Sequence, residues 1–330
     1  MSESDDRLLI RQLGIGHRVA RCLQVIAELG VADRLGEQPQ SAESLSAAVG
    51  AHPQALARVL RLLAAYGVFE EIGAYFRHTA ASRLLRTDHP QSQRPLLRMA
   101  GTAFSWEAYG QLEHSIRTGE AAAAHIAPGG VFERFATHPE EGRLFDEAMA
   151  AKSRDQVASV LDAYDFSGFK SIADIGGGRG HLLQAVLAAN PEARGVLFDL
   201  PEVIEPIASL ASERLALRTG SFFTDPLPAC DAYLLMTVIH DWADTEATAI
   251  LAAVRRAAPP QAKVLILEML MPGAPGIHPA KILDIEMLVM TGGRERTLAE
   301  YERRLDAASM RLVRVIRTRS PTVILEGQPG

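Results

Sequence analysis

The sequence predicts an α/β protein in which a helical N-terminal region precedes a larger region built on a mostly parallel sheet. Three observations support this fold class. Apolar residues recur at helical spacing through the first hundred residues, strands and helices alternate from Lys170 onward, and a run of glycines joins the first of these strands to the helix after it. Such alternation is typical of a parallel sheet covered on both faces. We expect domains at residues 1–98 and 166–330, joined by a helical bridge at 99–165.

The N-terminal region has the element order of a winged helix. A long apolar helix is predicted from Leu8 to Leu29, followed by two shorter helices at 44–49 and 53–66 and a hairpin at 68–78. Apart from this hairpin, the domain is predicted to be all-helical. Up to Arg98 the chain has 12 arginines and no lysine against 10 acidic residues, so a strongly basic DNA-binding face is not expected. We expect the domain to form a homodimer instead, because the apolar first helix needs a partner.

The C-terminal region reads as a Rossmann-like domain. Its strands are short and apolar, which predicts burial on both faces, and its last two strands are predicted to form a closing hairpin. The expected strands are 171–174, 195–199, 215–218, 231–236, 264–268, 311–317 and 322–325, and the expected helices are 182–189, 203–210 and 245–257.

Composition excludes several classes of protein. The net charge is −6, with 34 basic and 40 acidic residues, which argues against a general electrostatic grip on nucleic acid or an anionic membrane. Cys22 and Cys230 lie far apart and fit neither a disulfide framework nor a zinc site, so no metal is expected. The sequence shows neither a signal peptide nor an apolar run long enough to span a membrane. We expect a cytoplasmic protein.

Aromatic and methionine side chains occur in the bridge and again near residue 287. Most such side chains fill cores, but ligand pockets often lie between domains and use the same residue types. The residues expected to line a substrate pocket are Trp106, Phe145, Met149, Met287 and Met290.

The glycine run follows a predicted strand and precedes a predicted helix. A ligand can approach such a turn closely, and the helix N-terminus adds backbone N–H groups. The glycines stand at positions 176, 177, 178 and 180, whereas a dinucleotide fingerprint would require glycine where His181 stands. Asp174 precedes the turn and suits a ligand with a cationic amino group. Asp199 ends the next strand, where a carboxylate can accept hydrogen bonds from ribose hydroxyls.

Five segments together resemble one known family. They are Asp174 to Gly180, Phe198-Asp199-Leu200-Pro201, Gly220-Ser221-Phe222-Phe223, His240-Asp241-Trp242 and Gly292 to Thr297. In these segments, and over nearly the whole chain, the sequence resembles the two-domain small-molecule O-methyltransferases of plant caffeate type and their bacterial relatives.

The resemblance implies S-adenosylmethionine as cofactor, S-adenosylhomocysteine as product, and a hydroxylated aromatic or polyketide-like small molecule as acceptor. It makes His240 the general base that takes the proton of the acceptor hydroxyl, with Glu268 and Glu295 orienting its imidazole. The cofactor-binding residues that it implies are Asp174, Gly176, Gly178, Asp199, Leu200, Ser221 and Phe222.

The sequence departs from the family pattern at two places. Ser221 stands where plant relatives usually carry aspartate, and Met236 and Thr237 stand where relatives often carry lysine or arginine, so the adenine end of the cofactor is held differently. Two other functions stay open: the same fold and cofactor used for hydroxylation, decarboxylation or cyclisation, and a winged-helix regulator that senses a small molecule. The presence of His240, Glu268 and Glu295 favours methyl transfer.

Overall fold

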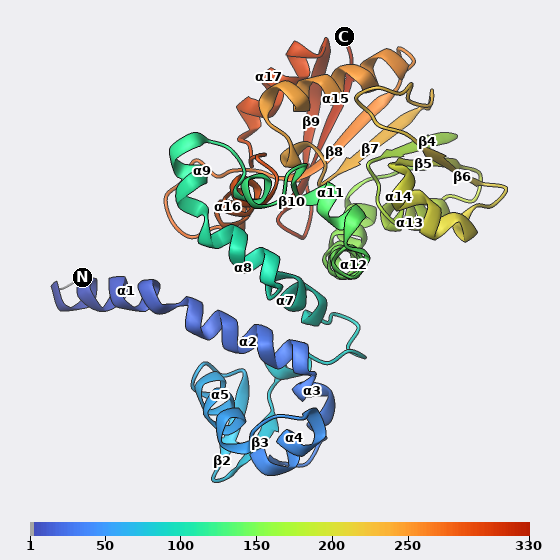
Figure 1. Cartoon of the computed structure of the whole chain (residues 1–330). Helices are drawn as coiled ribbons and strands as arrows, with labels where there is room; N and C mark the ends of the chain where they lie inside the picture. The colour runs from blue at the N-terminus through green and yellow to red at the C-terminus, as the bar shows by residue number, and fades with distance from the viewer. Residues whose placement is uncertain (1–2) are drawn as a thin grey trace. The chain divides into compact units, whose positions relative to one another are not determined.

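The computed structural model describes the backbone of residues 3–330 and the side chains from residue 5 onward, except that of Asp155. The chain forms two compact units (Figure 1). The first comprises the residues up to Trp106 together with Arg143–Ala151, and the second comprises Glu107–Gly142 and Lys152–Gly330. None of the helices within residues 3–330 has the length and hydrophobicity that a membrane span requires.

The first unit combines helices with a small antiparallel sheet of order β1-β3-β2. Its helices are α1 (Glu3–Ile15), α2 (His17–Leu29), α3 (Val31–Arg34), α4 (Ala42–Val49), α5 (Pro53–Ala65), α6 (Ala80–Arg83) and α7 (Arg94–Ala100). Its strands are β1 (Gln40–Ser41), β2 (Phe69–Ile72) and β3 (Tyr75–His78). The predicted hairpin of β2 and β3 is confirmed. The third strand, β1, was not predicted, because its two residues are too few to form a recognisable sequence pattern.

Helix ends in this unit follow from local chemistry. Ser41 caps α4 by accepting a hydrogen bond from the Ser44 amide at 3.2 Å, and Gly50 ends the helix in a left-handed conformation at φ 69°. The single long first helix of the prediction is wrong, because the chain divides it at Gly16 into α1 and α2. Gly14 and Gly16 lie close together, and glycine is a poor helix former.

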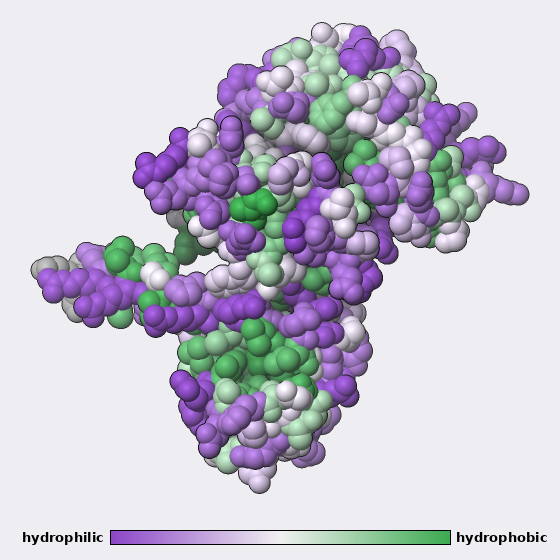
Figure 2. Space-filling model, viewed as in Figure 1, coloured by the Kyte–Doolittle hydropathy of each residue, from purple (hydrophilic) through white to green (hydrophobic). Residues whose placement is uncertain are grey.

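Apolar side chains remain exposed along α1. On the face shown in Figure 2, apolar surface is visible over this helix. The exposed side chains include Leu8 at 55%, Ile10 at 70% and Leu13 at 70%. A set of large apolar groups on one helix is typical of a surface that a partner covers.

The second unit is built on a seven-stranded sheet of order β6-β5-β4-β7-β8-β10-β9 (Figure 1). The first five of these are parallel neighbours, and β10 runs antiparallel to both β8 and β9, which confirms the parallel sheet with a closing hairpin. The strands are β4 (Ser171–Ile175), β5 (Arg194–Asp199), β6 (Leu215–Thr219), β7 (Ala232–Met236), β8 (Lys263–Met269), β9 (Met310–Arg317) and β10 (Thr322–Pro329).

Two core clusters lie on the two faces of this sheet. Side chains of β7 alternate between the two clusters, with Tyr233 in one and Leu234 in the other. The helices are α9 (Leu112–Thr118), α10 (Ala122–Ile126), α11 (Gly130–Thr137), α13 (His181–Ala189), α14 (Pro201–Ile204), α15 (Asp244–Ala257), α16 (Pro279–Met290) and α17 (Leu298–Ala307). Helices α8 (Ala103–Gly110) and α12 (Pro139–Ala163) contribute residues to both units.

The helix predicted at 203–210 is wrong in its type. The structure has the short helix α14 and then a 3₁₀ segment, η1 (Glu205–Leu210). Pro206 lacks a backbone N–H and cannot continue an α-helical hydrogen-bond ladder, which explains the change.

Candidate active site

The candidate catalytic residues lie at the carboxyl edge of the sheet. Strand β7 ends at Met236 and leads into the 3₁₀ turn η2 (Ile239–Asp241), while Glu268 lies near the end of the neighbouring strand β8. Between β7 and the turn, Thr237 adopts φ 54°, a conformation that a β-branched residue rarely takes. Such strain is often found beside functional groups, and here it lies three residues before His240.

The imidazole of His240 is held by two carboxylates. Its Nδ1 is 2.6 Å from Oε1 of Glu295 and 3.4 Å from Oε2 of Glu268. Because both neighbours are carboxylates, Nδ1 carries the proton of the neutral imidazole, and in that form Nε2 can accept one. Glu268 also fixes the backbone, since its Oε1 accepts hydrogen bonds from the amides of Ile239 at 3.0 Å and His240 at 3.2 Å.

This group of side chains is buried and highly charged. His240 is 3% exposed, Glu295 is 2% exposed and Glu268 is 0% exposed. Burial lowers the pKa of His240, but the charges of Glu268 and Asp241 and the hydrogen bond to Glu295 outweigh it and raise the pKa to about 9. Burial raises the pKa of Glu268. The acids therefore stabilise the imidazolium that forms when His240 takes a proton.

The segment Gly292–Thr297 packs directly against the histidine turn. A side chain at Gly293 would place its Cβ 2.0 Å from the carbonyl oxygen of His240, so only glycine fits there. The amide of Arg294 donates to that same carbonyl at 2.8 Å. Glu295 is anchored in turn, because its amide donates to Oδ1 of Asp284 at 2.8 Å.

Arg296 is fully buried and braces the turn from below. Its guanidinium donates to the carbonyls of Ile239 at 3.0 Å and Trp242 at 2.7 Å, and to the carboxylate of Asp244 at 2.9 Å. These contacts give Arg296 a structural role.

The glycine turn lies at the same edge of the sheet, between β4 and α13. Gly176, Gly178 and Gly180 have φ values of 66°, 58° and 69°, which favour glycine. A Cβ at Gly178 would meet no described atom within 4 Å, so this part of the turn is open to a ligand. Asp199 orders the turn by accepting hydrogen bonds from the amides of Gly178 at 2.8 Å and Leu200 at 2.7 Å.

Asp174 is buried beneath the turn. It is 1% exposed, and its Oδ1 makes no hydrogen bond within the described part of the chain. Burial and the charge of Asp199 raise its pKa to about 7. Gly177 allows this packing, because a Cβ there would lie 2.4 Å from Cγ of Asp174. A buried acid without a partner suits a ligand that brings a cation.

Aromatic rings form a further part of the site. The rings of Phe222 and Trp242 meet edge to face, with 5.8 Å between their centroids. Phe222 also lies close to the glycine turn, because a Cβ built on Gly176 would be 3.6 Å from its Cε1. Trp242 also stacks on Phe132 of α11 at 6.2 Å, a contact that periodicity alone does not reveal. The backbone amide of Ser221 donates a hydrogen bond to the carboxylate of Asp225 at 2.8 Å, so an acidic side chain lies next to Ser221 although position 221 is itself not acidic.

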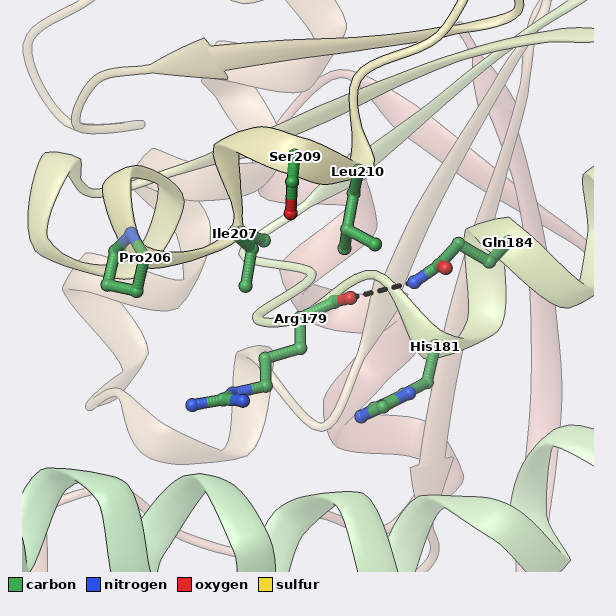
Figure 3. Close-up of a pocket in the computed structure, with 7 residues that line it drawn as sticks. All are labelled: Arg179, His181, Gln184, Pro206, Ile207, Ser209 and Leu210. Atoms are coloured by element: carbon green, nitrogen blue, oxygen red, sulfur yellow. Dashed lines mark hydrogen bonds between the residues drawn. The ribbon is translucent and has the colours of Figure 1, made fainter.

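A cavity of about 280 Å³ lies beside the turn, between the start of α13 and η1. Figure 3 shows Arg179 and His181 on one side of it and Ile207, Ser209 and Leu210 on the other. The carbonyl of Arg179 accepts a hydrogen bond from Gln184 at 3.0 Å. The sequence analysis used His181 only to distinguish glycine patterns, whereas the structure places both Arg179 and His181 in the wall of a cavity.

The residues expected to line a substrate pocket are divided between the two units. Trp106 belongs to the first unit, where its indole donates to Gln24 at 2.8 Å, and Phe145 and Met149 are half-buried in the same unit. Met287 and Met290 are buried in α16 of the second unit. That these five residues share one pocket stays a prediction.

The chain resembles known proteins over nearly its whole length. A family model of the O-methyltransferase domain matches residues 109–311, and one of the O-methyltransferase dimerisation domain matches residues 12–88. The phenazine O-methyltransferase PhzM of Lysobacter antibioticus is 38% identical over 327 residues, which cover 97% of this chain and 96% of that protein.

Solved structures of similar proteins contain the expected ligands. Human N-acetylserotonin methyltransferase in complex with S-adenosylmethionine has a TM-score of 0.91 at 28% identity, covering 100% of both chains. NcsB1, an O-methyltransferase from neocarzinostatin biosynthesis in complex with S-adenosylhomocysteine and 1,4-dihydroxy-2-naphthoic acid, has a TM-score of 0.81 at 31% identity, covering 94% of this chain and 96% of that one. The chain therefore belongs to the O-methyltransferase family, and it is an O-methyltransferase whose cofactor is S-adenosylmethionine.

Proposed function

We propose that this enzyme methylates a hydroxyl of an aromatic or polyketide-like small molecule, with His240 as the general base. The observation that carries the proposal is the 2.6 Å contact between Nδ1 of His240 and Glu295, which leaves Nε2 as a proton acceptor. The named substrates of two relatives support the acceptor class: a phenazine for PhzM and a naphthoic acid with two hydroxyls bound to NcsB1.

When bound, S-adenosylmethionine supplies an electrophilic methyl group on a sulfonium cation. Nε2 of His240 takes the proton of the acceptor hydroxyl while the oxygen forms its new bond to carbon, so no free phenolate is required. Glu295 and Glu268 hold the imidazole in this orientation and stabilise its cation. A phenol has a pKa of about 10, and a base with a pKa close to that value accepts its proton with little penalty.

The residues at the glycine turn fit the cofactor. The unpartnered Oδ1 of Asp174 suits the ammonium group, and the open face at Gly178 admits a ligand against the backbone. The carboxylate of Asp199, which the amides of Gly178 and Leu200 hold at this edge of the sheet, is the group that we assign to the ribose hydroxyls. We assign the remaining cofactor contacts to Gly176, Leu200, Ser221 and Phe222, the last by stacking on adenine.

The enzyme is proposed to work as a homodimer through its N-terminal domain. The match to a dimerisation domain and the exposed apolar side chains of α1 support this assignment. Sedimentation equilibrium at micromolar concentration tests it, and a monomer there would overturn it.

Methyl transfer from labelled S-adenosylmethionine to a panel of phenolic acceptors tests the function. Products should gain one carbon and two hydrogens. His240→Ala should lose transfer by a factor of about a hundred or more, as expected for loss of a general base, while calorimetry shows unchanged cofactor binding. Full activity of this variant would remove His240 from the mechanism.

A further inference from the structure

Asp284 is an acidic residue in the middle of α16 that the mechanism above does not use. Its Oδ1 accepts a hydrogen bond at 2.8 Å from the backbone amide of Glu295, which lies eleven residues further along the chain. The side chain of Glu295 in turn contacts Nδ1 of His240 at 2.6 Å. A carboxylate of α16 is therefore linked to the imidazole through a single residue.

The backbone on either side of Glu295 is held by other parts of the sheet edge. The amide of Arg294 donates to the carbonyl of His240 at 2.8 Å, and the carbonyl of Arg296 accepts from the amide of Met271, just beyond the end of β8, at 2.9 Å. These two bonds fix the path of the chain before and after Glu295.

The peptide group that joins Arg294 to Glu295 lies between these two anchors. Its N–H bonds to Asp284 at 2.8 Å, whereas its carbonyl is 3.4 Å from Nη1 of Arg296. Only the first of these distances is within the usual range for an N–H···O hydrogen bond. Asp284 therefore contributes most to the orientation of this peptide group, and that orientation sets the direction in which the side chain of Glu295 leaves the backbone.

The other charged groups near this link act elsewhere. Arg294 directs its guanidinium to Glu300 at 3.1 Å, and Lys281 of α16 donates to the carbonyls of Ala274 and Gly276. The charges that act on the imidazole itself are those of Glu268, Asp241 and Lys152. Asp284 differs from all of them, because it bonds to the backbone of Glu295.

Resting on the proposed role of His240, we propose that Asp284 is a positioning residue for the general base. Its carboxylate fixes the amide of Glu295 so that the Glu295 carboxylate meets Nδ1 of His240, which aims Nε2 at the acceptor hydroxyl. Met287 and Met290 lie on the same helix. One helix thus supports both the base and two of the residues expected to line the acceptor pocket.

Loss of the acceptor at position 284 has a defined effect on the pH profile. The hydrogen bond from His240 to Glu295 raises the pKa of His240, so loosening this bond lowers that pKa. The acidic limb of the kcat/KM profile should then move to lower pH, by up to about one unit. The plateau should fall about tenfold, because the imidazole is less well aligned. A residue that only stabilised the fold would not move the limb.

The test compares Asp284→Ala with Asp284→Asn and with a matched control, Asp231→Ala. The carboxylate of Asp231 likewise accepts backbone amides, from Lys170 at 3.0 Å and Ser171 at 2.9 Å, but at the opposite end of β4. Asp284→Ala should show the lower plateau and the shifted limb. Asp284→Asn keeps an acceptor oxygen and should recover most of both, and Asp231→Ala should keep the wild-type profile.

Proton NMR measures the same contact without turnover. The Nδ1 proton that His240 shares with Glu295 lies in a short hydrogen bond, so its resonance should stand far downfield in the wild type and be absent from His240→Ala. It should move upfield in Asp284→Ala and stay in place in Asp284→Asn. An unmoved resonance or an unmoved limb in Asp284→Ala, or an equal loss in Asp284→Asn, would overturn the proposal.

If Asp284→Ala does not fold, Asp284→Ser takes its place with the same expected results, because the serine hydroxyl is too short to reach the amide. Failure of the general-base assignment is seen separately, as activity retained by His240→Ala. The downfield resonance would still report whether Asp284 holds Glu295 against the imidazole.

Discussion

Replacement of Asp174 by asparagine is expected to stabilise the cofactor-free enzyme above pH 6 and to weaken cofactor binding. The carboxyl is 1% exposed, and burial together with the charge of Asp199 raises its pKa from 3.8 to about 7. Ionisation of this group in the folded protein is therefore unfavourable. Asparagine has nearly the same shape and cannot ionise.

The magnitude follows from linkage between protonation and folding. The folded carboxyl keeps its proton between pH 3.8 and about 7, where the unfolded one has lost it, so the free energy of unfolding falls as pH rises through this range. At about 1.36 kcal/mol per pH unit, the complete cost above pH 7 is about 4 kcal/mol, and about 2 kcal/mol of it arises between pH 5.5 and 7.5.

Urea unfolding of wild type and Asp174→Asn at equal protein concentration measures this difference. The advantage of the variant should grow by about 2 kcal/mol from pH 5.5 to 7.5. Asp165→Asn provides the control, because Asp165 is exposed, its pKa is lowered by bonds to Ser167, and it stays ionised throughout this range. Calorimetry should show at least a roughly tenfold weaker affinity for S-adenosylmethionine, from loss of one charge-assisted hydrogen bond. A difference that does not change with pH would refute the reasoning.

Two further substitutions test how the histidine turn is held. Arg296→Gln should lower the free energy of unfolding by about 3–5 kcal/mol, since it leaves the buried carbonyls of Ile239 and Trp242 without their guanidinium donor and removes a hydrogen bond from Asp244. In the same urea titration, Arg303→Gln, on a side chain that is 60% exposed, should change the free energy of unfolding by less than about 0.5 kcal/mol. Gly293→Ala should lower kcat/KM about a hundredfold by displacing the backbone of His240. Gly110→Ala should leave kcat/KM unchanged, because a Cβ at Gly110 meets no atom within 4 Å. Equal values of kcat/KM for the two variants would contradict the argument that Gly293 packs against His240.

The sequence predicts the sheet well because its strands are runs of apolar residues, as expected for strands that are buried on both faces. Five parallel strands and the closing hairpin lie where apolar runs were found, and the glycine turn follows β4 as expected. His240 follows β7 and Glu268 lies near the end of β8, so the ends of these parallel strands bring the two residues to one edge, whereas Glu295 lies in the loop between α16 and α17 and was implied only by the family resemblance. The distances that make them a cluster come only from the structure.

Other features could not be predicted from the sequence, because they depend on local geometry and on contacts between distant residues. Pro206 converts the end of a predicted helix to a 3₁₀ segment, and Gly16 divides a helix whose apolar spacing continues across it. The burial of Arg296 could not be predicted from the sequence either, since arginine is rarely fully buried.

The cofactor site and the catalytic cluster share one electrostatic arrangement. In each, an acid is buried with an oxygen that has no hydrogen-bond partner among the described residues: Asp174 in one, and Glu268 and Glu295 in the other. Each arrangement costs stability in the free protein. In the function proposed above, a cation arriving at either site relieves this cost: the cofactor's ammonium at Asp174 and the transferred proton at His240. With the cofactor bound as proposed, its sulfonium charge should oppose the proton that the carboxylates hold on His240 and should lower the pKa of the imidazole. Binding of the cofactor should therefore convert His240 from a proton holder into a base, so that the base becomes available only when a methyl donor is present.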